Sequence, residues 1–122
     1  FHLMVLLLLH QKDMKKVLNL VVTKRWFDMI VSGAKNEEYR EIKRYWITRL
    51  TTNCEVIHDV VVEKKCGKVL YRPYTHVIFS AGYGKNRPSI EKEIEDITIG
   101  LPKKGLCPDK WLCQAFFIIK FK

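Results

Sequence analysis

Short strand-like runs dominate this sequence, and the two segments with helical periodicity both fall in its first half. Val17–Val22 is nearly all apolar and rich in β-branched residues, as expected of a buried strand. Lys24–Ser32 carries an apolar stripe at helical spacing and is followed by Gly33, a typical residue for ending a helix. Roughly five to seven short strands with two short helices near the N-terminus predict a small α+β barrel, not an alternating βαβ sheet.

The other expected elements follow from alternation and from turn residues. A strand is expected at residues 36–42 and a short second helix at residues 45–52. Residues 56–63 and 69–72 are expected to be two strands joined by a turn at residues 65–68. Further strands are expected at residues 75–80, 97–99 and 115–121, with a Pro- and Gly-rich loop at residues 100–109.

The first thirteen residues read differently from the rest of the chain. Residues 3–9 form an apolar run that is too short to span a bilayer and lacks the basic flank of a signal peptide. Met14 then opens a more conventional start. We therefore expect residues 1–13 to be an N-terminal extension and residues 14–122 to form one domain, located in the cytoplasm without membrane contact.

The four cysteines and four histidines are scattered without the spacing of a metal motif. We expect no structural metal, no cofactor, and reduced thiols. The balance of charge is more informative, since 22 basic against 13 acidic residues give a net charge of +9. This balance favours RNA or an anionic small molecule such as a nucleotide as the partner, although a solvated surface that is merely basic is the alternative.

The densest group of charges lies at residues 33–40, where Lys35, Glu38 and Arg40 follow the expected end of the first helix. Glu38 and Arg40 share one face of the expected strand, so a turn or bulge must bring Lys35 to them. The cations could engage a phosphate or a base carbonyl, while Glu38 orients Lys35 or accepts from a base amino group. The alternative is a solvated edge strand with alternating charges.

The pattern G-x-K-x-x-E-x-R in this stretch resembles the signature of the ASCH family, particularly the small stand-alone type found in bacteriophages and bacteria. Other matching stretches follow in the same order along the chain. They are residues 18–20, 26–27, 41–43, 45–46, 77–79, 82–84, 87–88 and 116–120. The resemblance covers residues 17–121, with an apparent insertion around residues 53–72.

The resemblance implies a PUA-like β-barrel with a basic cleft, lined by this motif, that faces RNA or a modified nucleoside. One branch of the family resembles an amidohydrolase acting on N4-acetylcytidine, with a catalytic Lys followed three residues later by a nucleophilic Thr. Lys35 matches that Lys, but Glu38 stands where the Thr would be, so a water or Thr23 would have to replace it. Other relatives resemble ribonucleases. Lys35 and Glu38 are thus the catalytic candidates if the domain is an enzyme, and otherwise a binding module is expected.

Further candidate ligand contacts lie outside the motif. Lys24 matches a position beside the cleft that is often basic in the family. Tyr83, Lys85 and Arg87 lie in a glycine loop that fits no Walker A pattern but could form a basic rim with a stacking ring. The pair Tyr45 and Trp46 has helical spacing typical of core residues, and one of the two could still stack on a base. The oligomeric state is left open.

Overall fold

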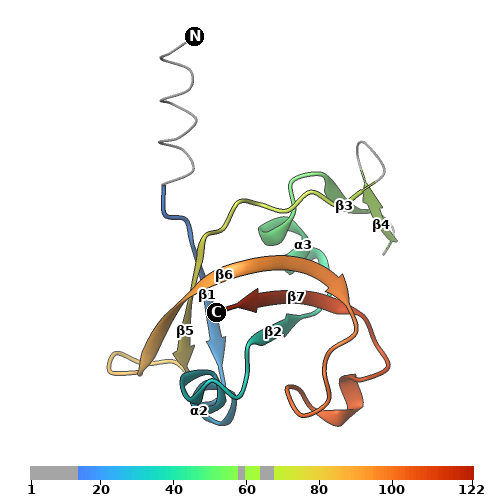
Figure 1. Ribbon diagram of the computed structural model, residues 1–122. Helices are drawn as coiled ribbons and strands as arrows, with labels where there is room; N and C mark the ends of the chain where they lie inside the picture. Colours follow the sequence, from blue (N-terminus) through green and yellow to red (C-terminus); the bar gives the residue numbers. More distant parts are fainter. Residues whose placement is uncertain (1–13, 58–59, 64–67) are drawn as a thin grey trace.

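The computed structural model describes residues 14–57, 60–63 and 68–122, in which two α-helices accompany a five-stranded mixed sheet and a two-stranded hairpin (Figure 1). The predicted α+β class is confirmed. Residues 1–13, which we expected to be an extension, lie outside the described residues. The elements in chain order are β1 (Val17–Val22), α2 (Lys24–Ser32), β2 (Glu37–Arg40), α3 (Arg44–Leu50), β3 (Cys54–Ile57), β4 (Val60–Glu63), β5 (His76–Ala81), β6 (Ser89–Gly100), a 3-10 turn (Asp109–Trp111) and β7 (Phe116–Phe121).

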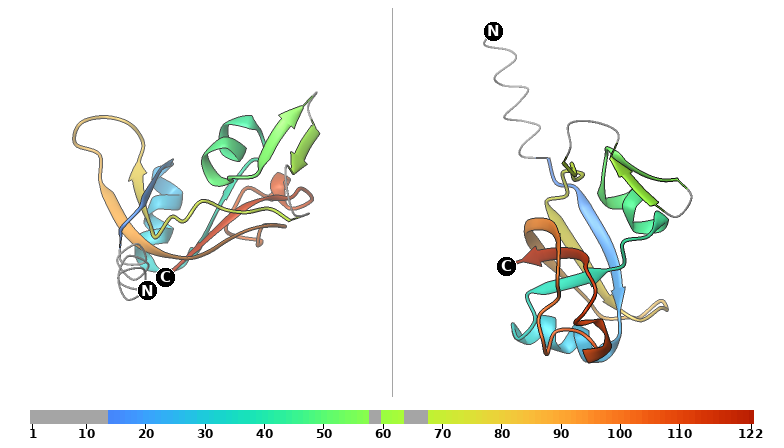
Figure 2. Two further views of the ribbon diagram at one scale, coloured as in Figure 1. Left: turned by 90° about the horizontal axis from the view of Figure 1, so that it is seen from above. Right: turned by 90° about the vertical axis from the view of Figure 1, so that its right-hand side faces the viewer.

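The large sheet has the strand order β1-β5-β6-β7-β2, with β1 parallel to β5 and the other pairs antiparallel. It curls through the long strand β6, whose pairing with β7 slips between Ile94 and Asp96 (Figure 2). In the described residues β1 and β2 do not pair, so the sheet is not closed into the expected barrel. Instead a side chain spans the opening, because Arg40 Nη2 donates to the carbonyl oxygen of Val21 over 3.0 Å.

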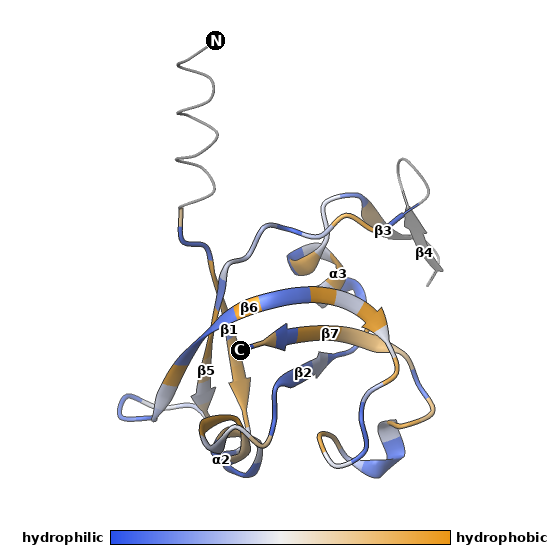
Figure 3. Cartoon of the chain, viewed as in Figure 1, coloured by the Kyte–Doolittle hydropathy of each residue, from blue (hydrophilic) through white to orange (hydrophobic). Residues whose placement is uncertain are grey.

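The core fills the concave side of this sheet. Alternation in β1 buries Leu18, Leu20 and Val22 against apolar residues of β5, β7 and both helices. A smaller cluster is centred on Tyr39 and Phe116 and includes Leu106, Trp111 and Leu112 of the loop between β6 and β7. Figure 3 shows the contrast between the apolar strand β1 and the hydrophilic strand β2. Most of β2 is nevertheless buried, so its charged side chains need partners inside the protein.

The hairpin differs from the prediction. Residues 56–63 were expected to form one strand, but β3 and β4 are separate and pair antiparallel, with Ile57 opposite Val60. The second expected strand, residues 69–72, is reduced to a single bridge between Tyr71 and Thr51. The predicted turn at residues 65–68 lies largely outside the described residues. A run of β-branched residues favours strand, but it does not fix the point where the chain reverses.

Gly33 ends α2 in the left-handed region, with φ 86°, and its amide donates to the carbonyl oxygen of Ile30. A Cβ at this position would meet no atom within 4 Å, so the cost of a side chain is conformational. We expect Gly33→Ala to lower the free energy of unfolding by about 1 kcal/mol, measured by urea denaturation. Gly33→Asn should lose clearly less, since Asn tolerates this conformation. Equal losses for both variants would contradict the explanation.

Candidate functional site

A turn after α2 brings Lys35 into the protein interior. The amide of Lys35 donates to the carbonyl oxygen of Met29 over 3.0 Å, and the chain then enters β2 at Glu37. The Lys35 side chain is only 1% exposed. Its Nζ lies 3.7 Å from Glu38 Oε1, so the turn that the sequence required is present and joins the two residues.

The buried ammonium group of Lys35 has a dense set of partners. Nζ donates to the carbonyl oxygen of Leu106, and it lies 5.2 Å from the ring centre of Trp26 and 4.8 Å from that of Tyr39. Burial lowers the pKa of Lys35 from the ordinary value of 10.5, and the attraction of Glu38 opposes that shift. Lys35 therefore sits where a neutral amine is easier to form than it is in water.

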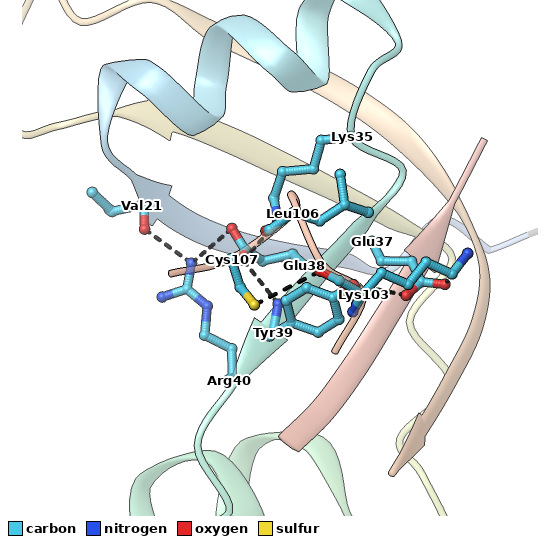
Figure 4. A network of polar contacts seen from close by, with 9 residues as sticks. All are labelled: Val21, Lys35, Glu37, Glu38, Tyr39, Arg40, Lys103, Leu106 and Cys107. Atoms are coloured by element: carbon cyan, nitrogen blue, oxygen red, sulfur yellow. Dashed lines mark hydrogen bonds and ion pairs between the residues drawn. The ribbon is translucent and has the colours of Figure 1, made fainter. Parts of the chain in front are cut away.

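Glu38 links Lys35 to Arg40, so the three predicted residues do come together (Figure 4). Glu38 Oε1 accepts from the amide of Tyr39 over 2.8 Å, and Oε2 lies 3.6 Å from Arg40 Nη2. The Arg40 guanidinium lies 5.1 Å from the ring centre of Trp46. Its Nε is buried without a hydrogen-bond partner among the described residues. This unpaired donor distinguishes Arg40 from an ordinary structural arginine.

The opposite face of β2 holds a second polar group, which the sequence did not reveal. Tyr39 Oη donates to Glu37 Oε1 over 2.9 Å and accepts from the amide of Lys103 over 3.1 Å. Lys103 Nζ lies 3.2 Å from Glu37 Oε2. Burial strongly raises the pKa of Tyr39, so its hydroxyl keeps its proton. These contacts fasten the loop of residues 101–115 to β2.

A cleft of about 680 Å³ opens beside Glu38 and Arg40, between the end of β1, β2, the start of α3 and the 101–115 loop. Its lining contains all three tryptophans of the chain and three tyrosines. These six aromatic residues are Trp26, Tyr39, Tyr45, Trp46, Tyr83 and Trp111. The charged lining residues are Arg40 and Lys43 against Glu38 and Glu41, so their formal charges cancel. The cleft is therefore aromatic and balanced in charge, where the sequence had suggested a basic one.

The structure separates the remaining candidate residues. Tyr83 lines the cleft and is 85% exposed. Lys24 forms an exposed ion pair with Asp28 over 3.0 Å and is not part of the lining. Lys85 and Arg87 do not line the cleft; they line a second depression, together with residues such as Asn19 and Ser80. Lys35 itself is outside the lining and touches the cleft only through Glu38 and the aromatic rings around it.

The pair Tyr45 and Trp46 lines the cleft with the two rings in edge contact, their centres 4.8 Å apart. Tyr45 is 50% exposed, and Trp46 also packs on the core. The opposite wall comes from Cys107 and Pro108, in the segment that the sequence suggested only as a loop, and from Trp111, which lies just beyond it. A tryptophan and buried apolar residues within a Pro- and Gly-rich loop were the available signal for this wall. Burial raises the pKa of the Cys107 thiol, and Lys35 opposes that shift.

Comparison of the chain with protein-family models, with curated proteins and with solved structures gives no match. Among the described helices, none is both long and apolar enough to cross a membrane. The described residues also contain no cluster of three His, Cys, Asp or Glu side chains that could hold a metal ion.

The burial of Lys35 predicts a pH dependence of stability. Between the lowered pKa of folded Lys35 and the ordinary 10.5, the unfolded chain binds a proton that the folded chain does not. The free energy of unfolding contributed by this site therefore rises with pH across that window and is lost as pH falls through the folded pKa. We expect the unfolding free energy of the wild type minus that of Lys35→Met to increase with pH as the pH rises towards 10.5.

Urea denaturation of both proteins at several pH values measures this difference. Because Lys35 also acts on the pKa of the Cys107 thiol, the same comparison is made in a Cys107→Ala background, which removes the contribution of that thiol. Parallel stability curves for the wild type and Lys35→Met would show that Lys35 keeps its ordinary pKa.

Proposed function

We propose that the cleft binds a base of RNA or of a modified nucleotide. The observation that carries this proposal is the lining of six aromatic side chains around about 680 Å³. Ligand sites for small molecules have volumes of this order and are mostly apolar, with a few placed polar groups. Stacking on aromatic side chains contributes about 1–3 kcal/mol per base and works for any base.

Glu38 and Arg40 supply the polar edge that a base needs. A carboxylate accepts from an amino or imino N–H of a base, and a guanidinium donates to a base carbonyl or ring nitrogen. The Tyr39 amide and the neighbouring cations hold Glu38 in place before any ligand arrives. Lys35 then serves to balance the charge of Glu38 and to orient it, and it does not contact phosphate from its buried position.

The balanced charge of the lining supports a neutral group in the cleft. Arg40 and Lys43 offset Glu38 and Glu41, so the excess of basic residues lies elsewhere on the molecule. The part of the ligand that enters is therefore the nucleoside and not a cluster of phosphates. Binding of this part should depend only weakly on salt, because few counterions are released.

The fold belongs to the same proposal. We infer a PUA-like domain of the ASCH type, in which the barrel stays open between β1 and β2. The order of the matching stretches along the sequence supports this assignment, as does the position of the G-x-K-x-x-E-x-R residues beside the opening. A cytoplasmic location fits both an RNA partner and cysteines kept as thiols.

Substitution of Glu38 tests the binding proposal. Glu38→Gln keeps the shape but removes the charge between Lys35 and Arg40. We expect the affinity for cytidine or another neutral nucleoside of a four-base panel to fall by about three- to tenfold, through lost orientation. The affinity for the corresponding 5′-monophosphate should hold or rise, because the site becomes more positive. Quenching of tryptophan fluorescence reports binding, since all three tryptophans line the cleft.

Glu95→Gln is the matched control, because this carboxylate lies outside the lining and forms only an exposed contact with Lys120. It should leave both affinities unchanged. Equal losses for nucleoside and monophosphate in Glu38→Gln would refute the orienting role of Glu38. An absence of quenching by any nucleoside in the wild type would remove the binding proposal itself.

A hydrolase is the second candidate, and two observations favour it. Burial makes the neutral amine of Lys35 more available than that of a solvated lysine, and Thr23 lines the cleft without a side-chain hydrogen bond to the helix it precedes. On N4-acetylcytidine, water or the Thr23 hydroxyl would attack the acetyl carbon and lose its proton to the Lys35 amine through Glu38, which joins Lys35 to the cleft. That proton would pass to N4 as the amide C–N bond breaks, giving cytidine and acetate, with water releasing acetate if Thr23 was acylated. A ribonuclease activity is the other form of this candidate.

Incubation of the protein with N4-acetylcytidine and with a structured RNA separates an enzyme from a binding module. Under the hydrolase proposal, the wild type releases cytidine or RNA fragments, and Lys35→Met loses at least about a hundredfold of that rate, as expected for loss of a general base. Thr23→Val distinguishes the two nucleophiles, because only the Thr23 route depends on it. If the wild type binds these ligands but turns neither over, the hydrolase proposal fails and only the binding function remains.

A further inference from the structure

A second depression, of about 620 Å³, lies on the face of the β1–β5–β6 sheet that points away from the core. The core side of these strands carries Leu18, Leu20 and Phe79, so the alternating residues Asn19 and Ser80 face outwards. The loop between β5 and β6 contributes Gly84, Lys85 and Arg87 to its lining. This depression is separate from the aromatic cleft and plays no part in the function proposed above.

Its polar groups are mostly hydrogen-bond donors. Ser80 and Ser89 are direct cross-strand partners, so their hydroxyls lie on the same face of the sheet. Ser80 is only 8% exposed, and none of the described residues forms a hydrogen bond with its hydroxyl. The amide group of Asn19 adds another donor nearby. The Ser80 hydroxyl is open to the depression, since the only buried polar side-chain atom without a partner among the described residues is Arg40 Nε, and it is therefore available to a ligand there.

The charge at this place is entirely positive. Lys85 and Arg87 line the depression, and neither lies within ion-pair distance of a carboxylate among the described residues. Among the residues that the structure describes, no acidic side chain contributes to the lining. Glu91 is the carboxylate nearest along the same face, opposite Ile78, and it is paired with Lys15 over 2.8 Å. Two free cations beside unpaired hydroxyls match the needs of a tetrahedral oxyanion.

We propose that this depression is an anion site that binds a phosphate group. Lys85 and Arg87 supply charge, and the hydroxyls of Ser80 and Ser89 with the amide of Asn19 donate to the phosphate oxygens. The aromatic cleft contrasts with it, since the charges of its lining cancel. The molecule thus provides two chemically different places, one for a neutral ring and one for an anion.

The position of the depression indicates which ligand carries the phosphate. This part of the proposal rests on the proposed base-binding function. Tyr83 of the cleft is adjacent in sequence to Gly84 of the depression. On β1, Val21 of the cleft lies two residues from Asn19 of the depression, a rise of about 7 Å. An oligonucleotide whose base enters the cleft can therefore place a neighbouring phosphate in the depression. The ligand class is a single-stranded oligonucleotide.

The test begins with inorganic phosphate alone, followed by amide chemical shifts. We expect phosphate to shift the backbone amides of Ser80, Gly84 and Ser89 and to leave those of Glu38 and Trp46 unchanged. In Lys85→Gln/Arg87→Gln these shifts should vanish. Unchanged amides in the wild type at millimolar phosphate, together with unaltered oligonucleotide affinity in the double variant, would overturn the anion site.

The second arm compares cytidine, cytidine 5′-monophosphate and a short cytidine oligonucleotide. We expect Lys85→Gln/Arg87→Gln to weaken the oligonucleotide at least about tenfold, with no change for cytidine. The magnitude of the log–log salt slope for the oligonucleotide should also fall by about 0.7, because one phosphate contact is lost. Loss for the monophosphate as well would assign the site to the nucleotide's own phosphate and contradict the oligonucleotide.

Lys16→Gln/Lys104→Gln is the matched control, because it removes the same charge from exposed positions outside both linings. Equal loss of oligonucleotide affinity in the two double variants would show a general effect of net charge and overturn the proposal. If cytidine does not bind but phosphate still shifts the three amides, the base-binding function fails while the anion site stands.

Discussion

The rest of the structure depends on the pairing of the buried Glu38 carboxylate with two cations. It lies within 3.7 Å of Lys35 Nζ and within 3.6 Å of Arg40 Nη2, in a region where an unpaired charge would be very costly. Removal of Glu38 would leave Lys35 and Arg40 without their shared carboxylate, whereas removal of either cation would leave Glu38 with one partner. Glu38 thus holds the three charges together as the common partner of both cations, and the chain around them has to place all three.

The position of Arg40 beside Glu38 also explains why the sheet can stay open. Arg40 reaches across from β2 and donates to the carbonyl of Val21 on β1, so the two edge strands are joined by a side chain. A ladder of backbone hydrogen bonds at this place would have closed the barrel and filled the space. Because a single guanidinium spans the opening, room is left for a cleft whose walls come from Trp26, Trp46 and Trp111.

The local parts of this arrangement could be predicted from the sequence. The apolar run of β1, the helical stripe ended by Gly33 and the final strand β7 all depend on neighbouring residues, and the structure has them close to the expected bounds. The meeting of Lys35 with Glu38 was also foreseeable, because it depends on one turn. The separate hairpin of β3 and β4 was not, since its pairing depends on where the chain reverses.

The long-range parts of the site could not be read in this way. Leu106 and Trp111 lie some seventy positions after Lys35 in the chain, and no local pattern says that their loop folds back on β2. Tyr83 lines the cleft whereas Lys85 and Arg87 of the same loop line the depression. A loop without regular alternation gives no indication of that. The balance of formal charges in the cleft could not be predicted either, because it depends on which residues line the cleft.

The loop of residues 101–115 is attached partly through its main chain, in addition to the Lys103–Glu37 ion pair and the packing of its apolar side chains around Tyr39. The carbonyl of Leu106 receives Lys35, and the amide of Lys103 donates to Tyr39. Main-chain anchors do not depend on which side chains the loop carries. A loop residue that faces the cleft without joining the apolar cluster, such as Pro108, can therefore be exchanged during evolution, or by an engineer, while the attachment is preserved. In this domain the selectivity of the pocket can diverge without any change in the charged residues that hold it open.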